Sequence, residues 1–295
     1  MSKICLVTGG AGFIGSNLIE HLVKDKNNEV ISLDNYFTGL KSNHVAGAEY
    51  REGHTKDIAK HVPETPDIIY HLGEYSRVAA SLAEPAVVWD LNIAGTLGVL
   101  EFWRQRQCKL VYAGSSTKFN KERADGVAGR DLAPYTWAKA INTELVANYS
   151  RWYELKYATV YFYNVYGPRE RAGQFSGAYG TVIETFKQCY IKGQPCEVRE
   201  PGTQTRAFTH VADTVAGIIL AGAKGEGDDY GISAAEVYSL LEVAKMFGCP
   251  VKMVPPTKTS RSADAVDSAK IKALGWQQTK TLKDYIEAIK RQPTT

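Results

Sequence analysis

Short apolar runs alternate with segments of helical spacing through about the first 165 residues. Nearly every residue in these runs is apolar, which is expected of parallel strands that are covered on both faces. Between the runs, apolar residues recur at helical spacing, as in Phe13–Leu22 and Pro85–Gln107. This alternation predicts an α/β fold built on a doubly wound parallel sheet. The runs are Ile4–Val7, Val30–Leu33, Asp67–Leu72, Lys109–Ala113 and Ala158–Tyr163, with a weaker one near Glu49–Arg51.

The alternation breaks after the last of these runs. Gly202–Arg206 is predicted to be a turn, and Ser239 with Glu242 forms a capping box that starts a helix. Further helices are expected near 182–192, from Val211 through Ala223, and near 270–274 and 282–289. We therefore predict a first domain over residues 1–165, to which a strand and helix near 205–223 return. A smaller, mixed α/β lobe is predicted over residues 166–295.

Composition and charge remove several classes of function. The net charge of +3 is spread without a basic block, so no nucleic-acid partner is expected. The five cysteines contain no Cys-x-x-Cys pair, which predicts reduced thiols and no metal site. No stretch approaches the roughly 18 apolar residues of a membrane span, and the start lacks a charged-then-apolar leader. We expect a cytoplasmic protein with no membrane partner.

The stretch Val7–Gly15 lies between a predicted strand and a predicted helix, and it has the spacing of a dinucleotide-binding turn. Gly9 permits the tight turn, Gly12 lets the backbone approach a pyrophosphate, and Gly15 lets the helix pack closely on the strand. Asp34 follows the next apolar run, nineteen residues after Gly15. A carboxylate there can bind an adenosine ribose and would repel a 2′-phosphate. The sequence thus predicts a Rossmann-type domain that binds NAD rather than NADP.

Tyr135 and Lys139 are four residues apart on a helix that Pro134 opens, so they share one face. A free phenol is a poor base at neutral pH, because its pKa is near 10. An ammonium about 4 Å away, at an effective dielectric constant of ~20, would favour a phenolate by about 4 kcal/mol. Ser115 and Ser116 follow the strand Lys109–Ala113, at the edge where ligands of such sheets bind. We predict that the tyrosine is a general base.

Two further polar residues precede this pair. His71 ends a predicted strand and is interpreted as a structural histidine rather than a catalytic one. Asn92 lies inside a helical pattern, where asparagine is a poor helix former. It is either a buried amide that bridges a kink through water or a plain polar surface position.

The order of these motifs resembles the extended short-chain dehydrogenase/reductase family, and within it the NAD-dependent nucleotide-sugar epimerases and dehydratases of the UDP-glucose 4-epimerase type. The resemblance covers nearly the whole chain. It is specific for the family and less so for the substrate. The motifs are Thr8-Gly9-Gly10-Ala11-Gly12-Phe13-Ile14-Gly15, Asp34-Asn35, His71-Leu72, Asn92-Ile93-Ala94-Gly95-Thr96, Ser115-Ser116, Tyr135-x-x-x-Lys139, Asn164-Val165-Tyr166-Gly167-Pro168-Arg169 and Leu274-Gly275-Trp276.

The resemblance implies roles for individual residues. Tyr135 is similar to the catalytic base, Lys139 to its partner and ribose ligand, and Ser115 to the hydroxyl that shares the sugar's proton; Asn92 matches the asparagine at the family's helix kink. The predicted cofactor-binding residues are Gly9, Gly12, Phe13, Ile14, Gly15, Asp34, Asn35, Thr38, Gly39, Asp57, Leu72, Gly73, Tyr135, Lys139 and Phe162. The predicted substrate-binding residues are Glu74, Ser115, Ser116, Thr117, Tyr135 and Asn164, with Arg206 and Arg261 as the diphosphate clamp.

The implied activity is the C4 epimerisation of a UDP-sugar through a transient 4-keto sugar, in a homodimer joined through helices near Pro85 and Pro134. A 4,6-dehydratase or a decarboxylase on the same scaffold is the alternative. Dehydration needs an added acid and base. In the dehydratases that the chain resembles, these groups directly follow the catalytic serine or threonine, where this chain has Ser116-Thr117 and no carboxylate. A non-catalytic NAD-binding protein is a third possibility, which the intact Tyr135, Lys139 and Ser115 disfavour.

Some positions depart from the family pattern. His54 replaces the aspartate that normally contacts adenine, and Tyr161 stands where an arginine is expected. Gly73-Glu74-Tyr75 replaces a small, uncharged segment beside the cofactor and the sugar. These departures indicate an unusual sugar pocket or a divergent branch of the family.

Overall fold

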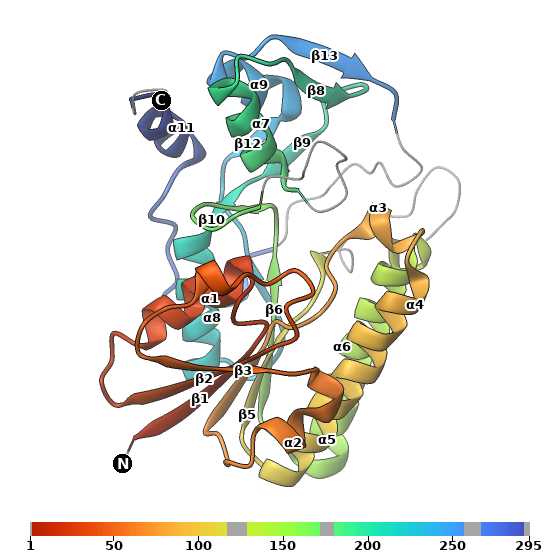
Figure 1. The fold of residues 1–295 in the computed structure, drawn as a ribbon, viewed down its shortest axis with the longest axis vertical. Helices are drawn as coiled ribbons and strands as arrows, with labels where there is room; N and C mark the ends of the chain where they lie inside the picture. Colours follow the sequence, from red (N-terminus) through yellow and green to blue (C-terminus); the bar gives the residue numbers. More distant parts are fainter. Residues whose placement is uncertain (1, 117–128, 172–179, 257–266, 292–295) are drawn as a thin grey trace.

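The computed structural model describes residues 2–116, 129–171, 180–256 and 267–291. Their centre is a parallel sheet of seven strands in the order β11-β6-β5-β4-β1-β2-β3 (Figure 1). The order reverses direction between β1 and β4, which places the carboxyl ends of these strands beside a ligand crevice. The strands of the sheet are β1 (Lys3–Thr8), β2 (Asn28–Asp34), β3 (Ala48–Glu52), β4 (Ile68–His71), β5 (Lys109–Ala113), β6 (Tyr157–Phe162) and β11 (Gly227–Ile232).

Helices cover both faces of the sheet, which explains why its strands are almost wholly apolar. Successive residues of β1 point to opposite faces: Cys5 and Val7 pack with α1 and α8, whereas Leu6 packs with α5 and α6. Figure 1 shows these two helical layers on either side of the strands. The helices are α1 (Phe13–Leu22), α2 (Ile58–His61), α3 (Val78–Ser81), α4 (Pro85–Val88), α5 (Gly95–Arg106), α6 (Pro134–Tyr153), α8 (Val211–Lys224) and α10 (Ala269–Ala273).

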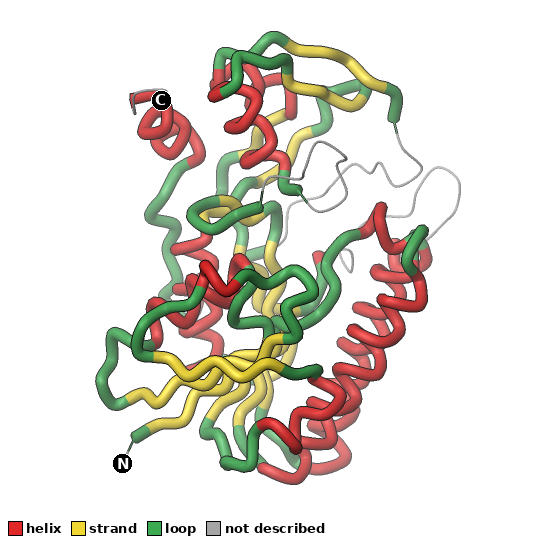
Figure 2. Tube along the Cα trace, viewed as in Figure 1, coloured by secondary structure: helices red, strands yellow, loops and turns green. Residues whose placement is uncertain are grey.

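A smaller lobe lies above the carboxyl ends of the strands, where Figure 2 shows helices mixed with short strands. Its core contains Phe186, Val198, Val243, Phe247 and Ile286. Its helices are α7 (Val182–Ile191), α9 (Leu240–Phe247) and α11 (Leu282–Arg291). Its paired strands are β7 (Val165–Tyr166) with β10 (Thr209–His210), β9 (Thr205–Ala207) with β12 (Val237–Ser239), and β8 (Cys196–Arg199) with β13 (Val251–Val254).

Most of the predicted elements are present, and three differences stand out. The segment predicted as a turn at Gly202–Arg206 ends in strand β9, because Thr205–Ala207 pairs with β12. Helix α8 packs on the large sheet, but the nearby strand β10 pairs with β7. The strand that extends the sheet is β11, which pairs with β6 and was not predicted.

The helical pattern over Pro85–Gln107 is interrupted by a π-helical turn, η3 (Trp89–Ala94), between α4 and α5. Asn92 lies in this turn and is fully buried. Its side chain accepts a hydrogen bond from the Tyr75 backbone N–H at 2.6 Å and donates to the Tyr75 carbonyl at 3.0 Å. Of the two interpretations of Asn92, the plain polar surface position is therefore wrong, because the amide is buried and bonds the Tyr75 backbone directly.

Within the described ranges, no helix is long and apolar enough to span a bilayer. The same residues contain no group of histidine, cysteine and acidic side chains that could hold a metal ion. All five cysteines are free thiols.

Candidate active site

The glycine turn between β1 and α1 has the geometry that its sequence predicts. Gly9 has φ of +73°, and a Cβ on it would lie 2.8 Å from the Gly73 backbone. A Cβ on Gly15 would lie 2.1 Å from the Gly9 carbonyl oxygen, so only glycine lets α1 begin this close to the turn. Gly12 caps α1 without a side chain, which leaves the first N–H groups of the helix directed at the cavity. These are the features of a pyrophosphate site.

Asp34, at the end of β2, is hydrogen-bonded to the glycine turn. Its carboxylate accepts hydrogen bonds from the backbone N–H groups of Ala11 (2.9 Å) and Tyr36 (2.8 Å). Burial raises the pKa of Asp34, and the two backbone hydrogen bonds oppose that rise. A Cβ on Gly39 would lie 2.8 Å from an Asp34 carboxylate oxygen, so this glycine keeps the loop close to the acid. Asp34 lines the cavity, where it fits a ribose.

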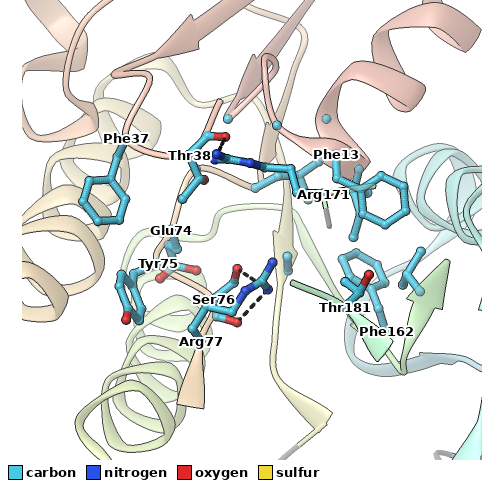
Figure 3. Close-up of a pocket in the computed structure, with 18 of the residues that line it drawn as sticks. Phe13, Phe37, Thr38, Glu74, Tyr75, Ser76, Arg77, Phe162, Arg171 and Thr181 are labelled. Atoms are coloured by element: carbon cyan, nitrogen blue, oxygen red, sulfur yellow. Dashed lines mark hydrogen bonds between the residues drawn. The ribbon is translucent and has the colours of Figure 1, made fainter. Parts of the chain in front are cut away.

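The turn and Asp34 form one wall of a cavity of about 470 Å³ between the sheet and the smaller lobe (Figure 3). Of the predicted cofactor residues, those that line it are Gly9, Gly12, Phe13, Ile14, Gly15, Asp34, Asn35, Thr38, Leu72, Gly73, Tyr135, Lys139 and Phe162. Gly39 and Asp57 are not among the residues that line it, and the Asp57 carboxylate pairs with Lys60. Gly53 and Thr55 line the cavity from that segment instead.

Tyr135 lines the cavity and contacts Ser115, which is not among the lining residues. Helix α6 starts at Pro134, and the Tyr135 hydroxyl lies 3.5 Å from Ser115 Oγ, which follows β5. Lys139 lies one turn further along α6 and is buried. Helix α6 and the carboxyl end of β5 thus bring Tyr135 and Ser115 together, with Lys139 on the same helix.

Glu74 directs its carboxylate at Lys139, with which it forms a buried ion pair. Burial raises the pKa of Glu74, but the charge of Lys139, an interaction with His71 and the hydrogen bonds from Lys139 and Thr96 together outweigh burial, so the pKa is lowered. Lys139 also donates hydrogen bonds to the Tyr112 hydroxyl (3.2 Å) and to the Ala113 carbonyl. Glu74 lines the cavity, yet its side chain is only 4% exposed.

His71 is a structural residue, in agreement with its interpretation from the sequence. It is fully buried between the hydroxyls of Thr8 (2.7 Å from Nδ1) and Thr96 (3.0 Å from Nε2). Burial lowers the pKa of His71 to about 4, so the ring is neutral at pH 7.

Two of the departures from the family pattern have structural explanations. The Tyr161 ring lies against Gly114, and its hydroxyl donates to Asp228 on β11 at 2.7 Å. His54 caps the turn before α2 and contacts Asp90 of η3 at 3.1 Å. Both residues therefore support the walls of the site.

Only some of the predicted substrate-binding residues line the cavity. Asn164 and Glu74 line the cavity, and Ser115 contacts Tyr135. Asn164 already donates a hydrogen bond to the Ala207 carbonyl at 2.9 Å. Arg206 is on β9, two residues before Phe208, which does line the cavity. Ser116 follows Ser115 and is half-buried, and Thr117 and Arg261 lie outside the described residues.

Three charged residues on the cavity were not predicted. Arg77 follows the Glu74 segment, and Glu170 and Arg171 follow β7 on the opposite side. Figure 3 shows the Arg171 side chain reaching across to Thr38, whose carbonyl oxygen accepts its hydrogen bond at 3.0 Å. Burial raises the pKa of Glu170 to about 7. The arginine after the Gly73-Glu74-Tyr75 departure could have been noticed as a candidate anion ligand, but nothing local marked Glu170 or Arg171.

A doubly wound sheet with this glycine turn and a Tyr-x-x-x-Lys helix defines a dinucleotide-dependent enzyme of the short-chain dehydrogenase/reductase type. The chain belongs to the NAD dependent epimerase/dehydratase family, whose model matches residues 5–233. The family acts on nucleotide sugars and depends on NAD. The glycine turn, the α1 N-terminus and Asp34 are the residues that would hold this cofactor.

Several relatives resemble almost the entire chain. A protein named putative UDP-glucose 4-epimerase from Methanocaldococcus jannaschii is 29% identical, with 96% of each chain covered. UDP-glucuronic acid decarboxylase 5 of Arabidopsis thaliana is 28% identical, with 96% of this chain and 89% of that protein covered. Among solved structures, UDP-glucose 4-epimerase from Thermotoga maritima with UDP-glucose has a TM-score of 0.86 at 26% identity, with 96% of each chain covered.

Proposed function

We propose that this protein is a 4-epimerase of a UDP-sugar. The observation that carries the proposal is the 3.5 Å contact of Ser115 with Tyr135, which lines the same cavity as the glycine turn. A sugar hydroxyl between these two groups would lie within reach of a base and of a second hydroxyl. The similarity to UDP-glucose 4-epimerases over nearly the full chain supports the same conclusion.

NAD, when bound, supplies the acceptor and donor of hydride at the sugar's C4. Tyr135 removes the proton of the C4 hydroxyl and later returns it, and Ser115 orients that hydroxyl by a hydrogen bond. The 4-keto sugar must then turn over within the cavity before it is reduced on its other face. Ser116 follows Ser115 without a carboxylate, so this position lacks the added acid that a dehydration would need.

Nuclear magnetic resonance of the anomeric protons tests this directly. The protein is incubated with UDP-glucose, UDP-galactose and their N-acetylated counterparts, each in turn. We expect one pair to interconvert to an equilibrium mixture reached from both directions, without added NAD being consumed. Tyr135→Phe is the matched control, because it keeps the ring and removes only the hydroxyl. Failure of every pair to interconvert would refute the epimerase.

A UDP-glucuronic acid decarboxylase is the second candidate, and Arg77 is the observation that favours it. A guanidinium on the cavity, near enough to Tyr135 and Glu170 to interact electrostatically, could pair with a sugar carboxylate. Relatives named as decarboxylases are 28% and 29% identical, as similar as the putative epimerase. Incubation with UDP-glucuronate distinguishes the two, since decarboxylation releases carbon dioxide and leaves a UDP-pentose.

We further propose that Arg206 and Arg261 bind the nucleotide diphosphate, because guanidinium groups suit phosphate oxygens. Phe208, two residues after Arg206, lines the cavity from the smaller lobe. This position of Phe208 supports the proposal, because β9 ends one residue before it.

A homodimer through the outer faces of α5 and α6 is also proposed. These helices run side by side along one side of the molecule (Figure 1). Large apolar side chains are exposed on and beside them, including Trp89, Leu97, Trp137 and Trp152. Such a concentration is typical of an interface rather than of a free surface. Light scattering should give twice the 32.5 kDa mass of the chain, and Leu97→Glu should return it to the monomer value.

A further inference from the structure

The Lys139 ammonium has protein acceptors for all three of its protons. It donates to Glu74, to the Tyr112 hydroxyl at 3.2 Å and to the Ala113 carbonyl. Its side chain is only 5% exposed, and the ammonium also lies 4.5 Å from the centre of the Tyr112 ring. The lysine is therefore fixed in the wall of the cavity by the protein alone.

The Glu74 carboxylate accepts hydrogen bonds from four side chains. One carboxylate oxygen accepts from Asn142 Nδ2 (2.7 Å), the Thr96 hydroxyl (2.8 Å) and the Tyr112 hydroxyl (3.2 Å), and the other accepts from Lys139. A carboxylate with this many donors is held in its ionised form.

Thr8 and His71 extend this set of hydrogen bonds beyond Thr96, and their protons are also directed toward Glu74. Thr8 Oγ1 accepts from the backbone N–H groups of Leu72 (3.2 Å) and Gly73 (3.1 Å), which use both of its lone pairs, so its own proton goes to His71 Nδ1. His71 must then carry its proton on Nε2 and donate it to Thr96, which donates to Glu74. Each proton in this chain is therefore used, and none is left to a water or a ligand.

We propose that Glu74 is a positioning residue: its carboxylate fixes Lys139 one helical turn from Tyr135 and offsets the lysine's charge, so that it sets the pH range in which Tyr135 acts. This role rests on the proposed function for the identity of the base. It differs from the direct sugar contact that the sequence predicts for Glu74, since the carboxylate is turned to the protein on both oxygens.

The charges that face this pair are few. Lys139 comes from α6, Tyr112 from β5, His71 from β4, and Arg77 faces Tyr135 from the segment after Glu74. His71 is neutral above about pH 4 because of its burial. In the described structure, the Glu74 carboxylate is the anion that pairs with Lys139. Without the negative charge of Glu74, the positive charge of Lys139 would no longer be offset, and it would favour the phenolate form of Tyr135.

The test uses the full chain with NAD and two neutral variants, Glu74→Gln and Glu74→Ala, so that a failure of one to fold does not end it. The measured quantity is kcat/KM for the nucleotide sugar that the protein converts, followed as a function of pH. We expect the acid limb of this profile to move to lower pH by about one unit in either variant. Glu74→Asp keeps the charge, and its limb should stay within a few tenths of a unit of the parent's. Thr96→Val is the control, because it removes a neutral donor from the same network and should leave the limb unmoved.

Several results would overturn the proposal. An unmoved limb in both neutral variants, with lower stability only, would show a purely structural role. A raised KM with an unmoved limb would show a substrate contact. A shift of the same size in Thr96→Val would show that altered packing, not charge, is responsible.

A second readout separates this proposal from the proposed function. Ultraviolet difference titration of each Glu74 variant against the same variant with Tyr135→Phe follows the phenol itself and needs no turnover. If wild-type protein converts no nucleotide sugar, the epimerase is wrong, but a Glu74-dependent shift in this titration would still support the positioning role.

Discussion

The buried amide of Asn92 gives a sharp prediction, because its two hydrogen bonds both go to the backbone of Tyr75. Asn92→Ala removes both bonds and leaves a buried N–H and a buried carbonyl without this partner. A buried donor or acceptor that is left unsatisfied costs about 1–3 kcal/mol, and Asn92→Ala leaves two such groups. Because Tyr75 is itself buried, little water can compensate. We expect the free energy of unfolding to fall by about 2–6 kcal/mol.

Urea denaturation with equal NAD in each sample measures this change, since a bound ligand adds to the apparent stability. Asn148→Ala is the matched control: it is the same substitution on helix α6, and the Asn148 side chain contacts only Arg151 of the same helix among the described hydrogen bonds. That variant should stay within about 0.5 kcal/mol of the parent. If Asn92→Ala were no more destabilised than Asn148→Ala, the amide would not be what holds the Tyr75 backbone in place.

Four further predictions concern chemistry and pH. Tyr135→Phe should lower kcat by ~10² to 10⁴ while the NAD content stays unchanged, and retained turnover would exclude the residue as the base. Nucleotide released on denaturation should be NAD, because the Asp34 carboxylate would repel a 2′-phosphate; recovery mainly of NADP would contradict this. Arg206→Ala should raise the KM for the nucleotide sugar and weaken UDP binding, and unchanged UDP affinity in a titration would remove it from the site. Because the folded pKa of His71 is about 4 and the unfolded value about 6.5, stability should be full above pH 6.5 and fall on acidification by up to ~3 kcal/mol. Urea denaturation at pH 7 and pH 5 should show about 2 kcal/mol of this loss in the parent and less in His71→Gln; equal losses would rule out His71 as its source.

Local patterns predicted most of the sheet and the cofactor end of the site. The runs before Gly9 and before Asp34 are uniformly apolar because β1 and β2 are covered on both faces, and such runs can be recognised without a structure. Strand β11 escaped prediction because its sequence, Gly-Asp-Asp-Tyr-Gly-Ile, resembles a turn. It is held in the sheet by tertiary contacts, including the Tyr161 hydroxyl on Asp228.

The buried contacts around Lys139 were less predictable, because their residues meet only in three dimensions. Glu74 and Lys139 are 65 residues apart, and no spacing rule connects them. Strand β8 is a different case, since Cys196–Arg199 alternates buried and exposed positions and this period-two signal was available in the sequence.

The π-helical turn at Trp89–Ala94 determines which residues of the following helix α5 face the sheet and which face outward. A helix advances about 100° per residue, so deleting one residue from this turn would rotate the remainder of α5 by that angle about its axis. Thr96, now bonded to Glu74, would swing off the sheet, and Leu97 would leave the outer face on which a partner is proposed to bind. A single wide turn thus couples the inner and outer faces of one helix, and a one-residue deletion there should impair catalysis and assembly together.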